Sequence, residues 1–67
     1  MITIQLNGKQ QTLPPGSTVQ DLFPIIGSDG KSVAVVVNDH VIRPENRPAH
    51  LIQEGDHIEV LMFAGGG

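Results

Sequence analysis

Three consecutive glycines, Gly65, Gly66 and Gly67, are the last residues of a 67-residue sequence and follow directly on the apolar stretch VLMFA. Glycine loses more backbone freedom on ordering than any other residue and buries no side chain in return, so this run adds little to a folded core. A Gly-Gly carboxylate is nevertheless an unhindered acyl group, and it fits a narrow channel because no Cβ blocks the approach of other atoms. Such an end allows a partner enzyme to attach AMP from ATP to the Gly67 carboxylate, which would turn it into an acyl donor, whereas a frayed chain end is the alternative interpretation.

Other residue types with catalytic chemistry do not form a recognisable site. His40, His50 and His57 have a spacing that matches no helical pair of metal ligands, so we expect them to be surface residues. Glu54 and Asp56 flank a glycine and are typical of a turn rather than of an acid/base pair. We therefore expect no catalytic residue, no metal and no bound cofactor in this chain, and ATP is used by the partner enzyme.

The string GSDGKS suggests a phosphate-binding loop only superficially. Two residues separate its glycines where the phosphate loop needs four, and a strand-like segment follows instead of a helix. The sequence contains no cysteine, which excludes a cysteine nucleophile and a persulfide.

Charge and hydropathy exclude two classes of partner. The net charge is −3, and Lys9, Lys31, Arg43 and Arg47 are scattered rather than clustered, which argues against nucleic-acid binding. No apolar run approaches the roughly 20 residues of a membrane span, and the start of the sequence does not resemble a signal peptide, so we expect a cytoplasmic protein.

The elements that would carry the glycines follow from local patterns. Residues 2–6 alternate as a half-buried strand, and Asn7-Gly8 predicts a type I′ turn into a more polar edge strand over 9–13. Ser17 or Thr18 can cap a short helix that ends near residues 26–27 and is shortened or kinked by Pro24.

Two later segments predict further strands. Residues 32–37, SVAVVV, are apolar at both parities and are expected to form a central strand. The last strand begins at His57, with Ile58 and Val60 directed inward. The order favours a β-grasp (ubiquitin-like) α+β domain over residues 1–64, with a mixed sheet of four to five strands and one main helix on one face, followed by a flexible glycine tail, residues 65–67.

The segments ITIQLNGK, VAVVVNDHVI and EGDHIEVLMFAGGG resemble the ThiS family, the ubiquitin-like sulfur carriers of thiamine biosynthesis, over essentially the whole chain. The resemblance implies that a ThiF-like adenylyltransferase of the ubiquitin-activating type adenylates Gly67. A sulfur-relay protein fed by cysteine desulfurase would then replace AMP with sulfur, which leaves a thiocarboxylate. A ThiG-like thiazole synthase would take that sulfur into the thiazole moiety of thiamine.

Strand parity also predicts a surface for these partners. If Ile58 and Val60 point inward, Leu61 and Phe63 point outward and lie beside Ala34 and Val36 on the sheet face that the helix leaves open, with Gly65 and Gly66 threading into the partner. A twist or bulge would instead turn Phe63 under the helix.

Arg43 and Arg47 could steer docking.

Three alternatives stay open at this point: a sulfur carrier for molybdopterin or cysteine synthesis, a ubiquitin-like modifier that forms isopeptide bonds, and an interaction module with an idle tail.

Overall fold

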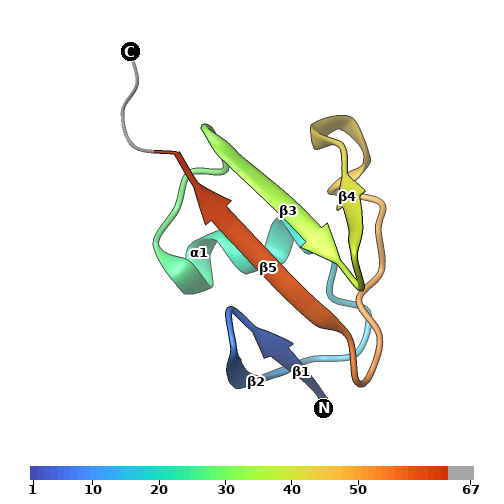
Figure 1. Ribbon diagram of the computed structural model, residues 1–67. Coiled ribbons are helices and arrows are strands. Elements are labelled where there is room, and N and C mark those ends of the chain that lie inside the picture. The colour runs from blue at the N-terminus through green and yellow to red at the C-terminus, as the bar shows by residue number, and fades with distance from the viewer. Residues whose placement is uncertain (64–67) are drawn as a thin grey trace.

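The computed structural model describes residues 1–63 and consists of one mixed sheet with a short helical segment across one of its faces (Figure 1). The strands are β1 (Ile2–Leu6), β2 (Lys9–Leu13), β3 (Val33–Val37), β4 (His40–Ile42) and β5 (His57–Met62). The helical elements are the 3₁₀ turn η1 (Val19–Asp21), the helix α1 (Leu22–Ile26) and the 3₁₀ turn η2 (Pro44–Asn46). The predicted β-grasp plan is thereby confirmed, whereas Ala64 and the glycine tail lie outside the described residues.

The sheet has the order β2-β1-β5-β3-β4, in which β1 and β5 are parallel and the other neighbours are antiparallel. The predicted crossover that brings the last strand beside the first is confirmed. The expectation that residues 32–37 form the central strand is wrong in one respect, because β5 occupies the middle and β3 lies between β5 and β4. Strand β3 is apolar at both parities for another reason: Val35 and Val37 face the core, while Ala34 and Val36 lie half-buried on the opposite face.

The first hairpin follows the predicted turn chemistry. Asn7 and Gly8 have φ angles of 52° and 81°, the positive values that a type I′ turn requires at both central residues. Glycine takes such a value without steric cost and asparagine tolerates it. The turn fixes the register of β1 on β2, so that Ile4 and Leu13 face the core and are almost fully buried.

The helical segment is short, as predicted. The Asp21 carboxylate accepts a hydrogen bond of 2.8 Å from the Thr18 backbone N–H, which anchors the first turn. Pro24 lies in the first turn of α1, where its missing N–H removes no α-helical hydrogen bond, and α1 ends at Ile26. Val19, Leu22 and Phe23 are buried against the sheet, and Ile26 packs at the margin of the core.

One side of the sheet therefore carries the whole described core, and the other side carries no second layer among residues 1–63. Figure 1 views the molecule from this uncovered side, with α1 passing behind β5. We call it the open face. Within the part of the chain that the structure describes, no helix has the length and apolar character needed to cross a bilayer.

Candidate functional site

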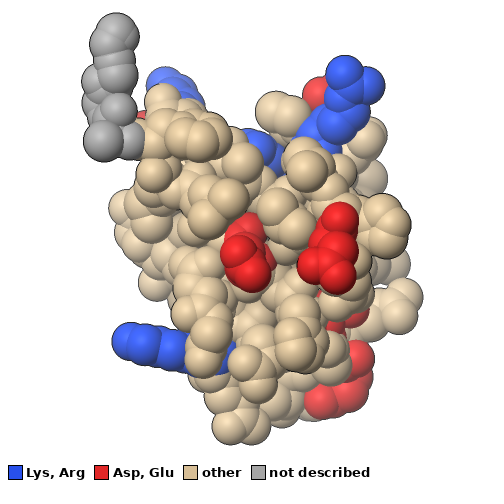
Figure 2. Space-filling model, viewed as in Figure 1, with Lys and Arg blue, Asp and Glu red and all other residues tan. Residues whose placement is uncertain are grey.

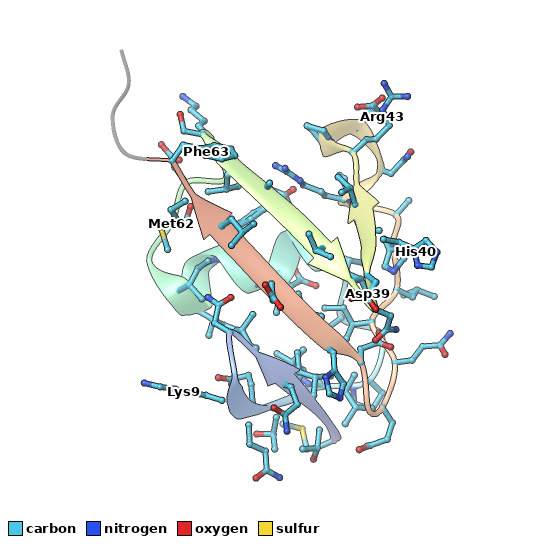
Figure 3. The ribbon with its side chains drawn as sticks, in the orientation of Figure 1. Lys9, Asp39, His40, Arg43, Met62 and Phe63 are labelled. Carbon is cyan, nitrogen blue, oxygen red and sulfur yellow. The ribbon has the colours of Figure 1, made fainter. Side chains whose placement is uncertain are left out.

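The candidate site begins where β5 ends, because this strand leads to the three glycines. Ile58 and Val60 are 1% and 5% exposed on the core side, and the parity of the strand then places Leu61 on the open face, where it is 49% exposed. Phe63 is 62% exposed, so the alternative in which it is turned under the helix is wrong. Met62 and Phe63 leave the end of β5 in different directions (Figure 3).

Register brings apolar side chains from three strands together on the open face. Ala34 lies opposite Leu61 in the antiparallel pair of β3 and β5, and Val36 lies opposite Val41 in the pair of β3 and β4. Residues opposite each other in a ladder project on the same face with Cβ atoms about 5 Å apart, so these residues are neighbours. We call this set the open-face patch: Ala34, Val36, Val41, Leu61 and Phe63.

Val41 is the member of the patch that sequence reasoning missed. It is 69% exposed. The structure fixes its direction, because its neighbour Ile42 is buried and adjacent residues in a strand point to opposite faces. In a three-residue strand, however, one alternation is too little to choose between the two parities.

Two carboxylates border the patch. Glu59 lies opposite Val36 in the sheet, and together with Asp39 it lines a shallow hollow of about 240 Å³. Figure 2 shows acidic groups within the open face, while lysine and arginine side chains stand at its periphery. The surface next to the end of β5 is thus apolar with an acidic border, which suits a partner surface with apolar and basic side chains.

The end of β5 is also hydrogen-bonded to the segment before β3, which comprises residues 27–32. The Phe63 N–H donates a hydrogen bond of 3.0 Å to the Ser32 carbonyl, which extends the ladder beyond the last residue of β5. Beside this contact, a groove of about 370 Å³ is lined by Met62 and Phe63 together with residues that include Ser28 and Lys31. The chain thus enters residues 64–67 from a backbone position that is fixed by a hydrogen bond.

Arg47 is not the exposed steering residue that the sequence predicted. It is 5% exposed and its guanidinium lies between α1 and the segment before β3. Arg43, in contrast, is exposed and lies 3.7 Å from the Glu45 carboxylate. The proline-rich sequence around both arginines gives no sign of this difference, because burial of Arg47 depends on partners 14 and 17 residues away.

Glu54 and Asp56 have structural roles, while His40 and His57 are exposed as predicted and His50 is half-buried. The carboxylates of Glu54 and Asp56 accept hydrogen bonds from the backbone N–H groups of Thr3 and Gln53, so both acids brace the turn before β5, as predicted. Asp56 is half-buried rather than fully solvent-facing and also accepts a hydrogen bond from the Asn38 side chain. Among residues 1–63, no three His, Asp or Glu side chains gather as a metal site would require.

The fold and this site define the protein as a ubiquitin-like β-grasp domain whose last strand leads from an exposed apolar patch into three glycines. The chain belongs to the ThiS family, whose family model matches residues 4–67. The crystal structure of a thiamine biosynthesis protein (ThiS) from Geobacter metallireducens is 29% identical and superposes with a TM-score of 0.81, over 98% of this chain and all of the other. The solution structure of a thiamine biosynthesis protein from the same organism gives a TM-score of 0.74, over 98% of this chain and 88% of the other.

Curated relatives are longer proteins. A thiazole synthase from Magnetococcus marinus is 38% identical over 64 residues, which are 96% of this chain and 20% of the relative. A thiazole synthase from Paramagnetospirillum magneticum is 29% identical over 62 residues, which are 92% of this chain and 19% of the relative. The chain thus spans about a fifth of the length of these relatives.

Proposed function

We propose that this chain is the sulfur carrier for formation of the thiazole moiety of thiamine, and that Gly67 is the residue that carries the sulfur. Membership of the ThiS family over residues 4–67 is the observation that carries the proposal. In this role the chain is a protein co-substrate, whose terminal carboxylate a partner enzyme activates.

The chemistry takes place at one acyl carbon. A carboxylate oxygen of Gly67 attacks the α-phosphorus of ATP, pyrophosphate leaves, and an acyl adenylate results. A persulfide sulfur then attacks the carbonyl carbon and AMP leaves, so that the C–O bond to AMP is replaced by a C–S bond. A thiol reduces the S–S bond of the resulting acyl disulfide, which releases the thiocarboxylate and leaves a disulfide. A ThiF-like adenylyltransferase would supply ATP, Mg²⁺ and catalytic groups, and a sulfur-relay protein or cysteine desulfurase would supply the sulfur.

The thiazole synthase relatives support a ThiG-like acceptor. Each of them is called a thiazole synthase and contains a segment similar to this chain. Two segments of one polypeptide meet at high effective concentration, which favours a pairing between a domain like this one and a thiazole synthase. The cytoplasm, where ATP and reduced thiols are available, is the expected location.

The open-face patch is the surface that we assign to these partners. Leu61, Phe63, Ala34 and Val36 were expected there from strand parity, and their exposure or half-burial beside Val41 leaves apolar area free for docking. Gly65 and Gly66 would thread into the partner's channel, where a side chain at either position would collide with the walls.

Intact mass spectrometry tests the proposal. The carrier is incubated with the adenylyltransferase, ATP and the sulfur source, and exchange of one oxygen for sulfur at Gly67 raises its mass by about 16 Da. A variant that lacks Gly66 and Gly67, and therefore has no Gly-Gly terminus, is the control and stays unmodified while retaining the stability of the parent, because the core residues that the structure describes lie between Ile4 and Val60. The modified carrier is then mixed with thiazole synthase and its acceptor substrate, and the mass gain is lost as sulfur is transferred.

The outcome separates the alternatives. Conjugates with lysine side chains and no thiocarboxylate would identify a ubiquitin-like modifier. A thiocarboxylate that thiazole synthase leaves intact would point to molybdopterin or cysteine synthesis. An unchanged mass under all conditions would contradict a carrier role and leave an interaction module.

A further inference from the structure

The buried guanidinium of Arg47 has no carboxylate partner among the described residues. Within residues 1–63, no Asp or Glu lies at ion-pair distance from it, although the side chain is 5% exposed. A charge that is removed from water in this way is costly unless polar groups replace the water. Arginine at this position is therefore expected to make polar contacts that an apolar side chain could not make.

Arg47 instead bridges two backbone carbonyls, that of Gly30 in the segment before β3 and that of Val33, the first residue of β3. Its Nη1 donates to the Gly30 carbonyl at 3.1 Å, and its Nη2 donates to the Val33 carbonyl at 2.9 Å. The Cζ atom lies 5.4 Å from the centroid of the Phe23 ring, within the range of a cation–π contact. The Arg47 carbonyl accepts a hydrogen bond of 3.2 Å from the Gln20 N–H, which holds the arginine itself against η1.

Ser32, whose carbonyl holds the end of β5, lies in the sequence between Gly30 and Val33, the two residues whose carbonyls Arg47 bridges. Its φ is 54°, in the left-handed region that non-glycine residues rarely adopt. Such a conformation is strained and persists only where the surroundings enforce it. The Ser32 carbonyl accepts the hydrogen bond from Phe63, and Phe63 directly precedes residues 64–67.

We propose that Arg47 is a positioning residue for the glycine tail. By fixing the Gly30 and Val33 carbonyls it holds Ser32 in its strained conformation, and Ser32 in turn fixes the backbone position from which the chain continues to Gly67. The inference rests on the proposed function, since a fixed backbone position at Phe63 matters only if a partner must bind the open-face patch and the tail together. When this position is fixed before binding, less conformational entropy is lost as the partner binds.

The positioning role predicts a specific kinetic change. Arg47→Lys keeps the positive charge but replaces a planar fork by a single ammonium group, which cannot bridge both carbonyls in the same geometry. The adenylation reaction is monitored through the release of pyrophosphate. We expect KM for the carrier to rise about tenfold and kcat to change by less than about twofold. We expect kcat to change little because Gly67 lies several residues after Phe63 in the sequence, so the reaction at its carboxylate is the same once the tail is bound.

Amide hydrogen exchange gives a readout that does not depend on the partner. The Phe63 amide of Arg47→Lys is expected to exchange at least about tenfold faster than in the parent. The Asn7 amide, which donates to the Ile58 carbonyl at the other end of β5, is the internal reference. Its exchange is expected to change only by as much as global stability changes.

Two control variants separate positioning from general destabilisation. Ile4→Val removes one buried methylene group from β1, far from the Arg47 contacts along the chain, and temperature is adjusted until its folded fraction equals that of Arg47→Lys. Arg43→Lys makes the same chemical change at an exposed arginine. Neither control is expected to raise KM or to accelerate exchange at Phe63 relative to Asn7.

A reversible cross-link tests the same link from the other side. Val33 and Met62 are opposite each other in the β3–β5 ladder, and the chain contains no cysteine, so Val33→Cys with Met62→Cys allows one disulfide next to the Ser32–Phe63 contact. In the Arg47→Lys background the oxidised form is expected to recover the low KM, and dithiothreitol is expected to abolish the recovery.

Three results would overturn the proposal: KM of Arg47→Lys within twofold of the parent, an equal rise in KM for Ile4→Val, or a formed disulfide that leaves KM high. Failure of the proposed function has a different signature, because the parent chain itself would then release no pyrophosphate. In that case the exchange ratio of Phe63 to Asn7 still decides whether Arg47 fixes the end of β5.

Discussion

At the scale of single residues, Gly30 and Ser32 in the segment before β3 have positive φ angles that their neighbours enforce. Gly30 has a φ of +81°, and a Cβ at this position would lie 3.0 Å from Cδ2 of the Phe23 ring. Its carbonyl is one of the two that Arg47 holds. The close approach of this backbone to an aromatic ring, and the ring's contact with the guanidinium, make residue 30 a point where a single methyl group matters.

Replacement of Gly30 by alanine measures this close approach. Gly30→Ala is expected to lower the free energy of unfolding by about 2–3 kcal/mol, of which about 1 kcal/mol comes from the positive φ and the rest from the collision with Phe23. Gly16→Ala is the matched control, because Gly16 has a φ of +88° and a methyl group there would meet no atom within 4 Å beyond its chain neighbours. Urea denaturation of both variants gives the difference, and equal losses would mean that the ring moves aside freely.

At the scale of elements, β1 ends before β5 does, and a side chain continues the pairing. The two strands are parallel neighbours over Gln5 and Leu6 only. Beyond this point the Asn7 side-chain Oδ1 accepts a hydrogen bond of 2.8 Å from the Val60 N–H, and the Asn7 backbone N–H donates to the Ile58 carbonyl. Asn7 therefore serves both the hairpin turn and the strand that leads to the glycines.

Two substitutions at this position separate its two roles. Asn7→Gly keeps a residue that accepts positive φ but leaves the Val60 N–H without its acceptor, so we expect a loss of about 1 kcal/mol in the free energy of unfolding. Asn7→Asp keeps both the turn preference and the oxygen acceptor and is expected to remain within about 0.5 kcal/mol of the parent. Thermal unfolding of the pair checks this, and a glycine variant as stable as the aspartate variant would contradict the role of the side chain.

At the scale of the whole molecule, the sheet has one covered face and one open face, and the two have different chemistry. The covered face holds the described core, while the open face carries the open-face patch with Glu59 and Asp39 at its border. A partner that covers this patch gains apolar burial at its centre and charge complementarity at its rim. The end of β5 lies at the same patch, so a partner that docks there is placed to receive residues 64–67.

Comparison of two exposed leucines tests this surface. Leu61 is 49% exposed within the patch, and Leu51 is 58% exposed outside it. Leu61→Gln is expected to raise KM for the carrier about tenfold in adenylation, as loss of an interface anchor does, and to shift stability by less than about 0.5 kcal/mol. Leu51→Gln is expected to leave both quantities unchanged. Equal effects of the two variants on KM would show that general surface hydrophobicity, not the patch, governs docking.

Features that depend on near neighbours could be predicted from the amino-acid sequence. Asn7-Gly8 specified the first turn, and Thr18 and Gly27 specified the start and the end of the helical segment, because Gly27 adopts a φ of 73°. The predicted shortening by Pro24 is wrong, since Pro24 lies in the first turn of α1, and alternation through Ile58 and Val60 specified that Leu61 is exposed. These outcomes rest on allowed φ angles, local hydrogen bonds and the two-residue period of a strand, all of which lie within a few residues. The β-grasp order followed from the same local signals in succession.

Contacts between distant residues, in contrast, became known only from the folded chain. The register of β3 on β5 places Ala34 beside Leu61, the pairing with β4 adds Val41, and β5 rather than β3 takes the middle of the sheet. Burial of Arg47 belongs to the same class, since its two carbonyl acceptors are 14 and 17 residues away and its surroundings in the sequence are those of a surface loop. The physical reason is that register and long-range side-chain contacts are selected by packing of the complete core, whereas parity, caps and turns are selected before any core exists.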